Sequence, residues 1–460
     1  CQVWACQVWA CQVWACQVWA HPLHKVASIM TQPSAPVRTV LALVVAVFIP
    51  IQLRAQQSEP VPAPARIPEI LPPTAEEWAA PDVPSRPAMS NWDLYAGGVY
   101  ANTSPVWVQA EYLLWWLQGN ELPPLVTTST AGTARPEAGV LGQPHTQVLF
   151  GDGRVDDDAR SGFRTTLGVR LGHWFDALME SELQFDYLWL GDGQSSGDYY
   201  SDSGEHAILA RPFFNTQLGQ QDAELVSYPG VVAGGIEVET SSDLSAAGVT
   251  FRQGWLSGSR GRLEWLAGYR YLQLQEELGV HETLVITDPG GSVPVGTTFD
   301  LLDEMSTWNE FHGGDLGVQW WTHAHGWTFE FVTKLAVGGI ARTVQIDGDT
   351  LVDTPGDPTV LAPGGLLTQP TNIGRHRTGR FTAVPELSIK VRRQLTHHLI
   401  LTAGYSLVIV DHVVRTGDQL DLVVNPSQIG GGELSGVPRP GVLMHDSTLW
   451  LHGFSVGLEW

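Results

Sequence analysis

From residue 105 to residue 460, hydrophobic and polar side chains alternate with a period of two along many separate segments. In the segment 162–173, Phe163 and Leu167 lie on one face and Arg164 and Arg170 on the other. Such alternation predicts β-strands that have one apolar and one polar side. Ten segments share this pattern: 106–118, 162–173, 177–190, 244–255, 261–274, 311–321, 326–340, 379–393, 398–410 and 447–460.

The connections between these segments are alternately short and long. Four of them are turns of three to five residues, whereas the other five contain 36 to 53 residues. The segments are long enough to cross a bilayer as tilted strands, which takes about 9 to 11 residues. Short turns on one side and long loops on the other are typical of outer-membrane barrels. The sequence therefore predicts an all-β fold, a transmembrane antiparallel up-and-down β-barrel of about ten strands (about 10–12), with short periplasmic turns and long external loops.

Tryptophan residues favour a membrane barrel over the main alternative, a secreted β-sandwich or propeller, whose strands also alternate. A membrane barrel carries girdles of aromatic residues at both of its interfaces. Tryptophans near predicted strand ends are Trp107, Trp116, Trp174, Trp189, Trp255, Trp327, Trp450 and Trp460. Because Trp460 ends the last strand, the C-terminus is similar to the signal that the barrel-assembly machinery recognises.

The first 104 residues divide into three parts. Residues 1–29 contain the pentapeptide CQVWA four times and hold all four cysteines. This spacing fits no helix, strand, zinc site or redox motif, and we interpret the segment as translated upstream DNA that is not native. Residues 30–55 have the basic, apolar and cleavage regions of a signal peptide. The proline-rich stretch 56–104 predicts an extended periplasmic linker, which leaves 105–460 for the barrel.

The charge of the chain excludes one class of partner. The sequence has 25 basic and 48 acidic residues, a net charge of −23, and without residues 1–55 it has 22 basic and 48 acidic residues, a charge of −26. So acidic a chain is unsuited to binding phosphates, and no nucleic acid partner is expected. The acidic excess lies mainly in the predicted loops, where it would concentrate cations at an external mouth.

The polar faces of the predicted strands define the expected lumen. With nine acidic and eight basic residues on these faces, the interior is almost neutral. In a barrel of about ten strands such groups pair and narrow the lumen. The predicted lumen-lining residues are Glu111, Arg164, Arg170, Glu180, Glu182, Asp186, Arg252, Arg262, Glu264, Arg270, Asp315, Glu330, Lys334, Glu386, Lys390, Arg392 and Glu459.

An acidic run in one loop is a candidate metal site. Asp152, Asp156 and Asp158 offer carboxylate oxygens that suit Ca²⁺. Their spacing is not that of a known calcium loop, and a solvated acidic loop is the simpler explanation. No other cofactor is expected.

Catalysis is not predicted. Asp411-His412 and His445-Asp446 are neighbours in the sequence, but adjacent residues of a strand point to opposite faces and do not make a dyad by themselves. The chain also contains no G-x-S-x-G or H-E-x-x-H motif. We therefore predict that the protein is not an enzyme.

Several stretches of the sequence resemble beta-barrel porin family seven, a family of outer-membrane β-barrels. They include VLFGDGRVDDDARSG at 148–162, ILARPFFN at 208–215, LAGYRYLQL at 266–274 and GDQLDLVVNPSQI at 417–429. The resemblance extends over residues 106–460 and implies an outer-membrane barrel without an established transport role. It offers no catalytic residues.

Two functions are compatible with this sequence. The first is a porin-like channel for small solutes, with a cation preference that comes from its acidic external mouth. The second is a plugged structural barrel that anchors long surface loops for adhesion or envelope integrity. In both cases we expect the protein in the cell outer membrane, in contact with outer-membrane lipid, and the sequence leaves monomer and trimer open. Pairing of the interior charges across the lumen would favour the second function.

Overall fold

The structure is a computed structural model that describes residues 104–200, 207–258 and 261–460. The upstream repeat, the signal peptide and the linker up to residue 103 lie outside the described residues and stay predictions. None of the helices in the described part of the chain is long and apolar enough to span a membrane.

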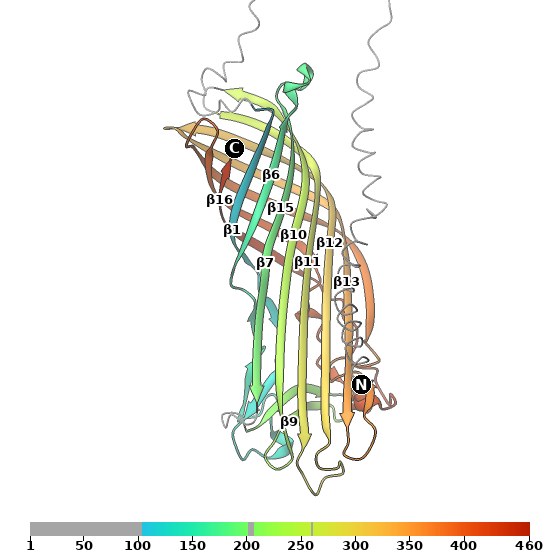
Figure 1. Cartoon of the computed structure of the whole chain (residues 1–460). Coiled ribbons are helices and arrows are strands. Elements are labelled where there is room, and N and C mark those ends of the chain that lie inside the picture. Colours follow the sequence, from blue (N-terminus) through green and yellow to red (C-terminus); the bar gives the residue numbers. More distant parts are fainter. Residues whose placement is uncertain (1–103, 201–206, 259–260) are drawn as a thin grey trace, which may run out of the picture. The chain divides into compact units, whose positions relative to one another are not determined.

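In the described residues, ten antiparallel strands form a closed ring (Figure 1). Each strand pairs with the next one, and β18 pairs with β1 to close the ring. The ring strands are β1 (Val106–Leu117), β6 (Ala159–Arg170), β7 (Ser181–Tyr200), β10 (Val232–Gly258), β11 (Gly261–Ile286), β12 (Thr298–Ala324), β13 (Trp327–Asp353), β15 (Gly374–Gln394), β16 (Ile400–Val413) and β18 (Ser447–Glu459). The predicted ten-stranded barrel is confirmed, because each predicted segment overlaps one of these strands.

Short connections join β6 to β7, β10 to β11, β12 to β13 and β15 to β16, and we call this end of the ring the turn end. The tightest turn described is His325-Gly326 between β12 and β13, where both residues have positive φ angles of 52° and 76°. Two positive φ angles are what a two-residue hairpin turn of type I′ requires. The connection from β6 to β7 is longer than predicted, because residues 171–180 form two short 3₁₀ helices there.

Four ring strands extend far beyond the segments predicted for them. Strands β10 to β13 contain 26 or 27 residues each, so much of the long connections predicted at 191–243, 275–310 and 341–378 consists of strand. The reason is a change in which face is apolar. In β11, Trp265 is exposed on the outer face, whereas Leu278 and Val280 are buried on the inner face. The apolar parity therefore shifts by one residue, and the alternation that marks the predicted segment ends where the strand continues.

The extended strands form an external structure that we call the cap. It consists of the extensions of β7 and β10 to β13, together with segments of the long connections that pack on their inner faces. The other strands are β2 (Asn120–Leu122), β3 (Val126–Ser129), β4 (Thr146–Phe150), β5 (Gly153–Val155), β8 (Leu209–Asn215), β9 (Gln220–Ser227), β14 (Val360–Pro363) and β17 (Val423–Val424), and the 3₁₀ helices are η2 (Arg135–Glu137), η3 (Leu171–His173), η4 (Asp176–Leu178), η6 (Gly417–Gln419) and η7 (Pro426–Gly431). Strands β3, β4, β8, β9 and β17 make one small sheet and β2 and β5 another.

The outer face of the ring carries the apolar surface that a bilayer requires. Phe163, Leu316, Leu335, Phe381 and Phe454 are examples of large apolar side chains that are 42 to 74% exposed there. Burying them in lipid removes this apolar area from water. Several tryptophans of the predicted girdles are exposed as expected, namely Trp174, Trp255, Trp327, Trp450 and Trp460.

Trp107 contradicts the girdle prediction. Its side chain is only 5% exposed and has the parity of the inward-facing Gln109 and Glu111. The indole lies against Gly168 of β6, where an added Cβ would be 2.0 Å from Trp107 Cε2. The glycine thus leaves the space that allows the tryptophan to face inward.

Candidate functional site: the barrel interior

The interior of the ring contains two networks of ion pairs. The first network lies nearest the turn end and includes Arg252, whose Nη1 is 3.0 Å from Glu182 Oε1 and whose Nη2 is 2.5 Å from Glu264 Oε2. Arg262 Nε also contacts Glu264, at 2.7 Å from Oε1. The two pairs of Arg252 join β10 to its neighbours β7 and β11, whereas Arg262 and Glu264 both belong to β11.

On the other side of the interior, Arg392 joins the first network to the last strand. Its Nη1 is 3.1 Å from Glu330 Oε2, and its Nη2 donates to Glu459 Oε2. The ring of Trp321 lies 4.9 Å from the Arg392 guanidinium and 5.3 Å from that of Arg252. The Trp321 ring thus lies near both guanidinium groups, and cation–π attraction to them stabilises its position.

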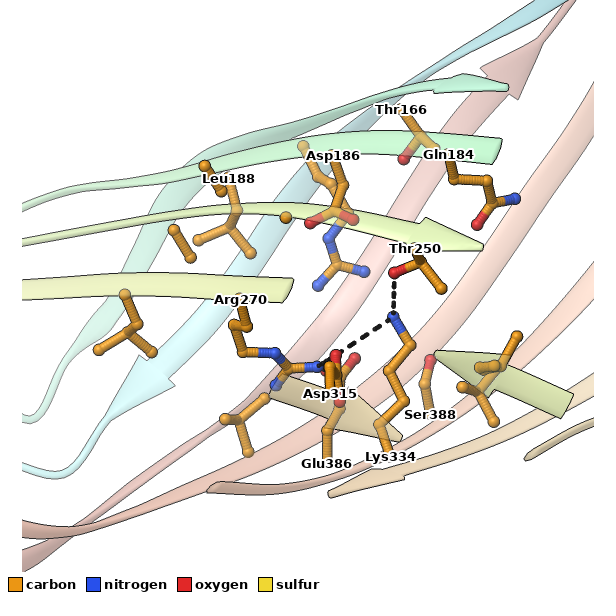
Figure 2. Close-up of a pocket in the computed structure, with 18 of the residues that line it drawn as sticks. Thr166, Gln184, Asp186, Leu188, Thr250, Arg270, Asp315, Lys334, Glu386 and Ser388 are labelled. Atoms are coloured by element: carbon orange, nitrogen blue, oxygen red, sulfur yellow. Dashed lines mark hydrogen bonds and ion pairs between the residues drawn. The ribbon is translucent and has the colours of Figure 1, made fainter. Parts of the chain in front are cut away.

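The second network lies further from the turn end and is drawn in Figure 2. Arg270 Nη2 lies 2.8 Å from Asp315 Oδ2 and 2.5 Å from Glu386 Oε2, and Lys334 Nζ lies 3.9 Å from Asp315 Oδ2. The Lys334 ammonium also donates to Thr250 Oγ1 at 3.4 Å. Strands β11, β12, β13 and β15 therefore place their charged side chains at one common level.

A second part of this network centres on Glu111 of β1. The carboxylate is 3% exposed and accepts a hydrogen bond from Lys390 Nζ at 3.1 Å and another from Ser455 Oγ at 3.1 Å. Arg164 Nη1 lies 3.7 Å from the same carboxylate. Three strands that are far apart in sequence thus meet at one acidic residue.

A small cavity remains beside the second network. Its volume is about 130 Å³, and it lies between the charged residues and the apolar side chains of Trp115 and Leu188. Figure 2 shows Asp186 and Thr166 across from Lys334 and Asp315. An apolar cavity of about 150 Å³ can hold a benzene-sized molecule, so this cavity has room for several waters or one molecule of about that size, and for no larger solute.

Beyond the cavity, an apolar layer crosses the whole interior. Its buried side chains come from every ring strand except β6. Leu113, Leu190, Leu274 and Phe311 are 0% exposed, and Trp115 is 2% exposed. We call this cluster the apolar layer, and its members are Leu113, Trp115, Leu117, Leu188, Leu190, Leu244, Leu272, Leu274, Phe311, Ala336, Ile340, Val384, Val408, Val410, Val413, Leu449 and Leu451.

Buried charged groups reappear where the ring meets the cap. Arg415 Nη2 lies 2.5 Å from Glu276 Oε1, and its Nη1 donates to the carbonyl oxygens of Gln118 and Gly119 at 2.7 and 3.0 Å. This arginine follows β16 and binds β11 and the chain after β1. It therefore attaches a long connection to the inside of the barrel.

Inside the cap, one arginine faces three acidic side chains. Arg211 Nη2 is 2.5 Å from Asp303 Oδ2 and its Nη1 is 3.5 Å from Glu282 Oε2. Burial raises the pKa of Glu224 to about 7, against the opposing effect of Arg211. Burial and the neighbouring Glu224 likewise raise the pKa of Glu282, which lies beyond the membrane-spanning part of β11, well above its usual range. The cap therefore retains a proton that a solvated carboxylate would lose.

A family model described as "Putative beta barrel porin-7" matches residues 107–460. The chain belongs to this family. The assignment agrees with the closed ring and its exposed apolar outer face, and the protein is a β-barrel of the outer membrane. No curated protein matches the chain.

Solved structures share only remote likeness with this member of the beta barrel porin-7 family. The outer membrane protease OmpT from Escherichia coli is 7% identical, with a TM-score of 0.34, over 78% of this chain and 97% of that one. A FadL homologue from Pseudomonas aeruginosa is 9% identical, with a TM-score of 0.20, over 77% and 89%. The toluene transporter TodX of P. putida is 6% identical, with a TM-score of 0.19, over 77% and 89%. Likeness this low tells nothing about activity.

The structure places most of the predicted lumen-lining residues in the two networks. Asp186 faces the cavity, and Arg170 Nε lies 3.7 Å from Glu182 Oε2. Glu180 is the exception, because it is exposed in the connection between β6 and β7. Without Glu180, eight acidic and eight basic residues of the predicted set remain inside.

The proposed calcium ligands do not form one group. Asp152 and Asp158 are exposed, whereas Asp156 is buried and accepts a hydrogen bond from Thr240 Oγ1 at 2.7 Å. Among the described residues, no group of three or more His, Cys, Asp or Glu side chains could hold a metal ion. The sequence shows that these three residues are close along the chain, but it does not show how the folded loop orients their side chains.

The Asp411-His412 pair departs from simple strand geometry. A bulge follows Val410 in β16, and His412 has a positive φ of 62°. His412 Nε2 therefore lies 3.7 Å from Asp411 Oδ2, and its Nδ1 lies 3.6 Å from Asp446 Oδ1. Both distances exceed that of a hydrogen bond, and Asp446 is instead bound by Arg342 at 2.5 Å.

Sequence analysis missed the apolar layer and Trp321. The layer is visible in the sequence only as apolar residues on the face assigned to the lumen, such as Leu272 and Leu274 after Arg270. Trp321 follows Trp320, so the pattern alone does not tell which of the two rings faces inward. Trp320 is 46% exposed and Trp321 contacts the interior arginines.

Proposed function

We propose that this protein is a plugged structural barrel that anchors the cap at the cell surface, and that its resting lumen does not pass solutes. The observation that carries the proposal is the apolar layer, to which nine of the ten ring strands contribute. A hydrated ion that enters this layer must give up its water shell. Transfer of an unpaired ion into such a medium costs several kcal/mol or more.

The charged networks support the same proposal. Eight acids and eight bases remain on the inner faces, and within the described part of the chain all of them except Asp186 form ion pairs, some between neighbouring strands and others, such as Lys390 with Glu111, between strands that are not neighbours in the ring. Groups that are engaged in such pairs offer no free charge to a passing solute. The remaining cavity of about 130 Å³ holds several waters or at most one benzene-sized molecule, and the apolar layer lies beyond it.

The cap is the part that the barrel would present outside the cell. Its inner face is a hydrophobic core formed by the extended strands and the segments from the long connections. Exposed acidic residues on the extended strands give the cap a negatively charged surface: Glu239, Glu277, Asp300, Glu304 and Asp347. A folded, acidic surface structure of this kind fits a role in adhesion or envelope integrity.

Planar-bilayer recording of the refolded full-length protein tests the closed lumen. We expect no current steps from the wild type, while a heat-dependent shift in gel mobility verifies that the barrel is folded. The double variant Leu113→Ser/Phe311→Ser places hydroxyl groups in the apolar layer and is expected to leak ions. Its control, Leu114→Ser/Leu316→Ser, changes outward-facing side chains that are 37 and 63% exposed. Steady conductance steps in the wild type would overturn the proposal.

The role of the cap is tested in cells. Deletion of β8 and β9 removes part of the cap but none of the ring strands. We expect weaker surface attachment or greater sensitivity to detergent, with the amount of inserted barrel unchanged. If both properties stayed at the wild-type level, the cap would not have this role.

The second candidate is the porin-like channel, which the family description favours. It requires the apolar layer to move aside in a conducting state. The acidic cap would then favour cations over anions at the mouth. Cation-selective current in the bilayer experiment would support this function.

A further inference from the structure

A groove lies on the outer wall of the barrel where β1, β16 and β18 approach the cap. Its volume is about 760 Å³. The wall is formed mainly by aromatic side chains, and the overhang comes from the chain around β5. Residues of the wall are Trp116, Tyr405, Trp450, His452 and Phe454, and residues of the overhang are Arg154 and Asp157.

The aromatic wall is a rigid surface. Trp116 stacks on His452 with ring centroids 5.8 Å apart and an angle of 18° between the planes. Tyr405 packs edge-on against Phe454 at 5.1 Å, and its hydroxyl is hydrogen bonded to His452 Nδ1 at 2.9 Å. Trp450 and Phe454 are nevertheless 46 and 57% exposed. The side chains are held in place by one another, yet they present a large uncovered apolar face.

The occupant of this groove must come from the bilayer. The same outward face continues toward the turn end with Tyr112, Leu114, Val456 and Leu458, which are 37 to 53% exposed and belong to the lipid-facing surface. A ligand in the groove is thus continuous with the layer of lipid chains around the barrel. Acyl chains can lie along the apolar wall while a headgroup reaches the overhang.

The overhang offers one positive and one negative group. Arg154 lies in β5 opposite Glu121 of β2, so the small β2–β5 sheet fixes its position. Gly119 allows the two chains to approach closely, because an added Cβ would be 2.6 Å from Val155 O and 2.9 Å from Asp157 Cβ. Arg154 and Asp157 are both exposed. A guanidinium binds phosphate well, and a carboxylate or an aromatic face binds an ammonium group.

We propose that this groove binds one membrane lipid with a zwitterionic headgroup that combines a phosphate and a primary amine. The phosphate contacts Arg154, the amine contacts Asp157, and the acyl chains lie along the aromatic wall. A purely anionic headgroup would place its charge next to Asp157 without a compensating amine. The charge pair therefore selects for phosphatidylethanolamine-type lipids over anionic ones.

Native mass spectrometry of the full-length protein, released from nanodiscs of equal phosphatidylethanolamine and phosphatidylglycerol content, tests this proposal. We expect one retained phosphatidylethanolamine per barrel. Arg154→Gln should lower its retention about tenfold, the effect of losing one charge-assisted hydrogen bond. The control Arg375→Gln removes an exposed arginine of β15 that is not part of the groove and should leave retention unchanged.

Three results would overturn the proposal. They are equal retention of the two lipids, no retained lipid, and equal loss in both arginine variants. The exchanged variant Arg154→Asp/Asp157→Arg keeps one charge of each sign at the overhang and should retain more phosphatidylethanolamine than Arg154→Gln. Heat-dependent gel mobility verifies that every variant is folded.

Discussion

The stability of the cap should fall as pH rises, because the cap holds a buried proton near Arg211. Burial raises the pKa of Glu224 from its ordinary value of 4.5 to about 7. The Oε2 atom of Glu224 and the Oε1 atom of Glu282 are buried without a hydrogen-bond partner. Protonation of one carboxyl relieves the repulsion among the three acidic groups.

The size and sign of the effect come from linkage. Between the unfolded value of 4.5 and the folded value of about 7, the folded cap binds a proton that the unfolded chain has already released. The free energy of unfolding therefore decreases by about 1.4 kcal/mol per pH unit in this window, or about 3 kcal/mol in all. The contribution is fully present below about pH 4.5 and is lost as pH rises through about 7. Glu282 adds a loss of the same sign, since burial raises its pKa as well.

Hydrogen exchange at the cap amides measures this loss. The amides of Leu367 and Thr368 donate to Asp303 at 3.1 and 2.9 Å and report on local opening. After correction for intrinsic exchange, their protection should drop about 100-fold between about pH 5 and about pH 8. Glu224→Gln mimics the protonated acid and should flatten this dependence. The control Glu304→Gln changes an exposed residue next to Asp303 and should keep the wild-type slope. Protection that does not vary with pH in the wild type would refute the reasoning.

Three further substitutions probe the interior, each measured as the free energy of unfolding in urea. Phe311→Ala removes a fully buried ring from the apolar layer and should cost about 3–5 kcal/mol; a loss below about 1 kcal/mol would show that the layer is loosely packed. Arg392→Ala leaves two buried carboxylates without their arginine partner and should cost about 3–5 kcal/mol. Gly168→Ala places a methyl group against Trp107 and should cost about 1–3 kcal/mol, whereas Gly314→Ala, with nothing within 4 Å, serves as its control.

The ring itself was predictable because local chemistry determines it. A strand between lipid and a charged interior must alternate apolar and polar residues. Adjacent residues such as Phe163 and Arg164 show this alternation in the sequence. Short turns also have local signals, as at His325-Gly326. The parity of each strand position predicted which charged residues line the interior. This prediction fails at Glu180 because that residue lies in a connection rather than in a strand.

The extensions of β10 to β13 could not be read in the same way. Parity states which face a residue occupies but not what covers that face. In the cap, inward residues such as Ile236 and Leu278 face a protein core, whereas inward residues nearer the turn end face other charged groups. The inward positions are therefore apolar in the cap and charged nearer the turn end. Only the tertiary structure shows which of these two environments a position faces.

The sequence by itself therefore determined the number of ring strands, the faces of their residues and the near balance of interior charge. The tertiary structure decided which charges meet, as in the pairing of Arg270 with Glu386, which are 116 positions apart. It also decided that an apolar layer lies across the interior. The physical reason is that contacts across a barrel depend on how the closed ring aligns distant strands, and no local pattern contains that alignment.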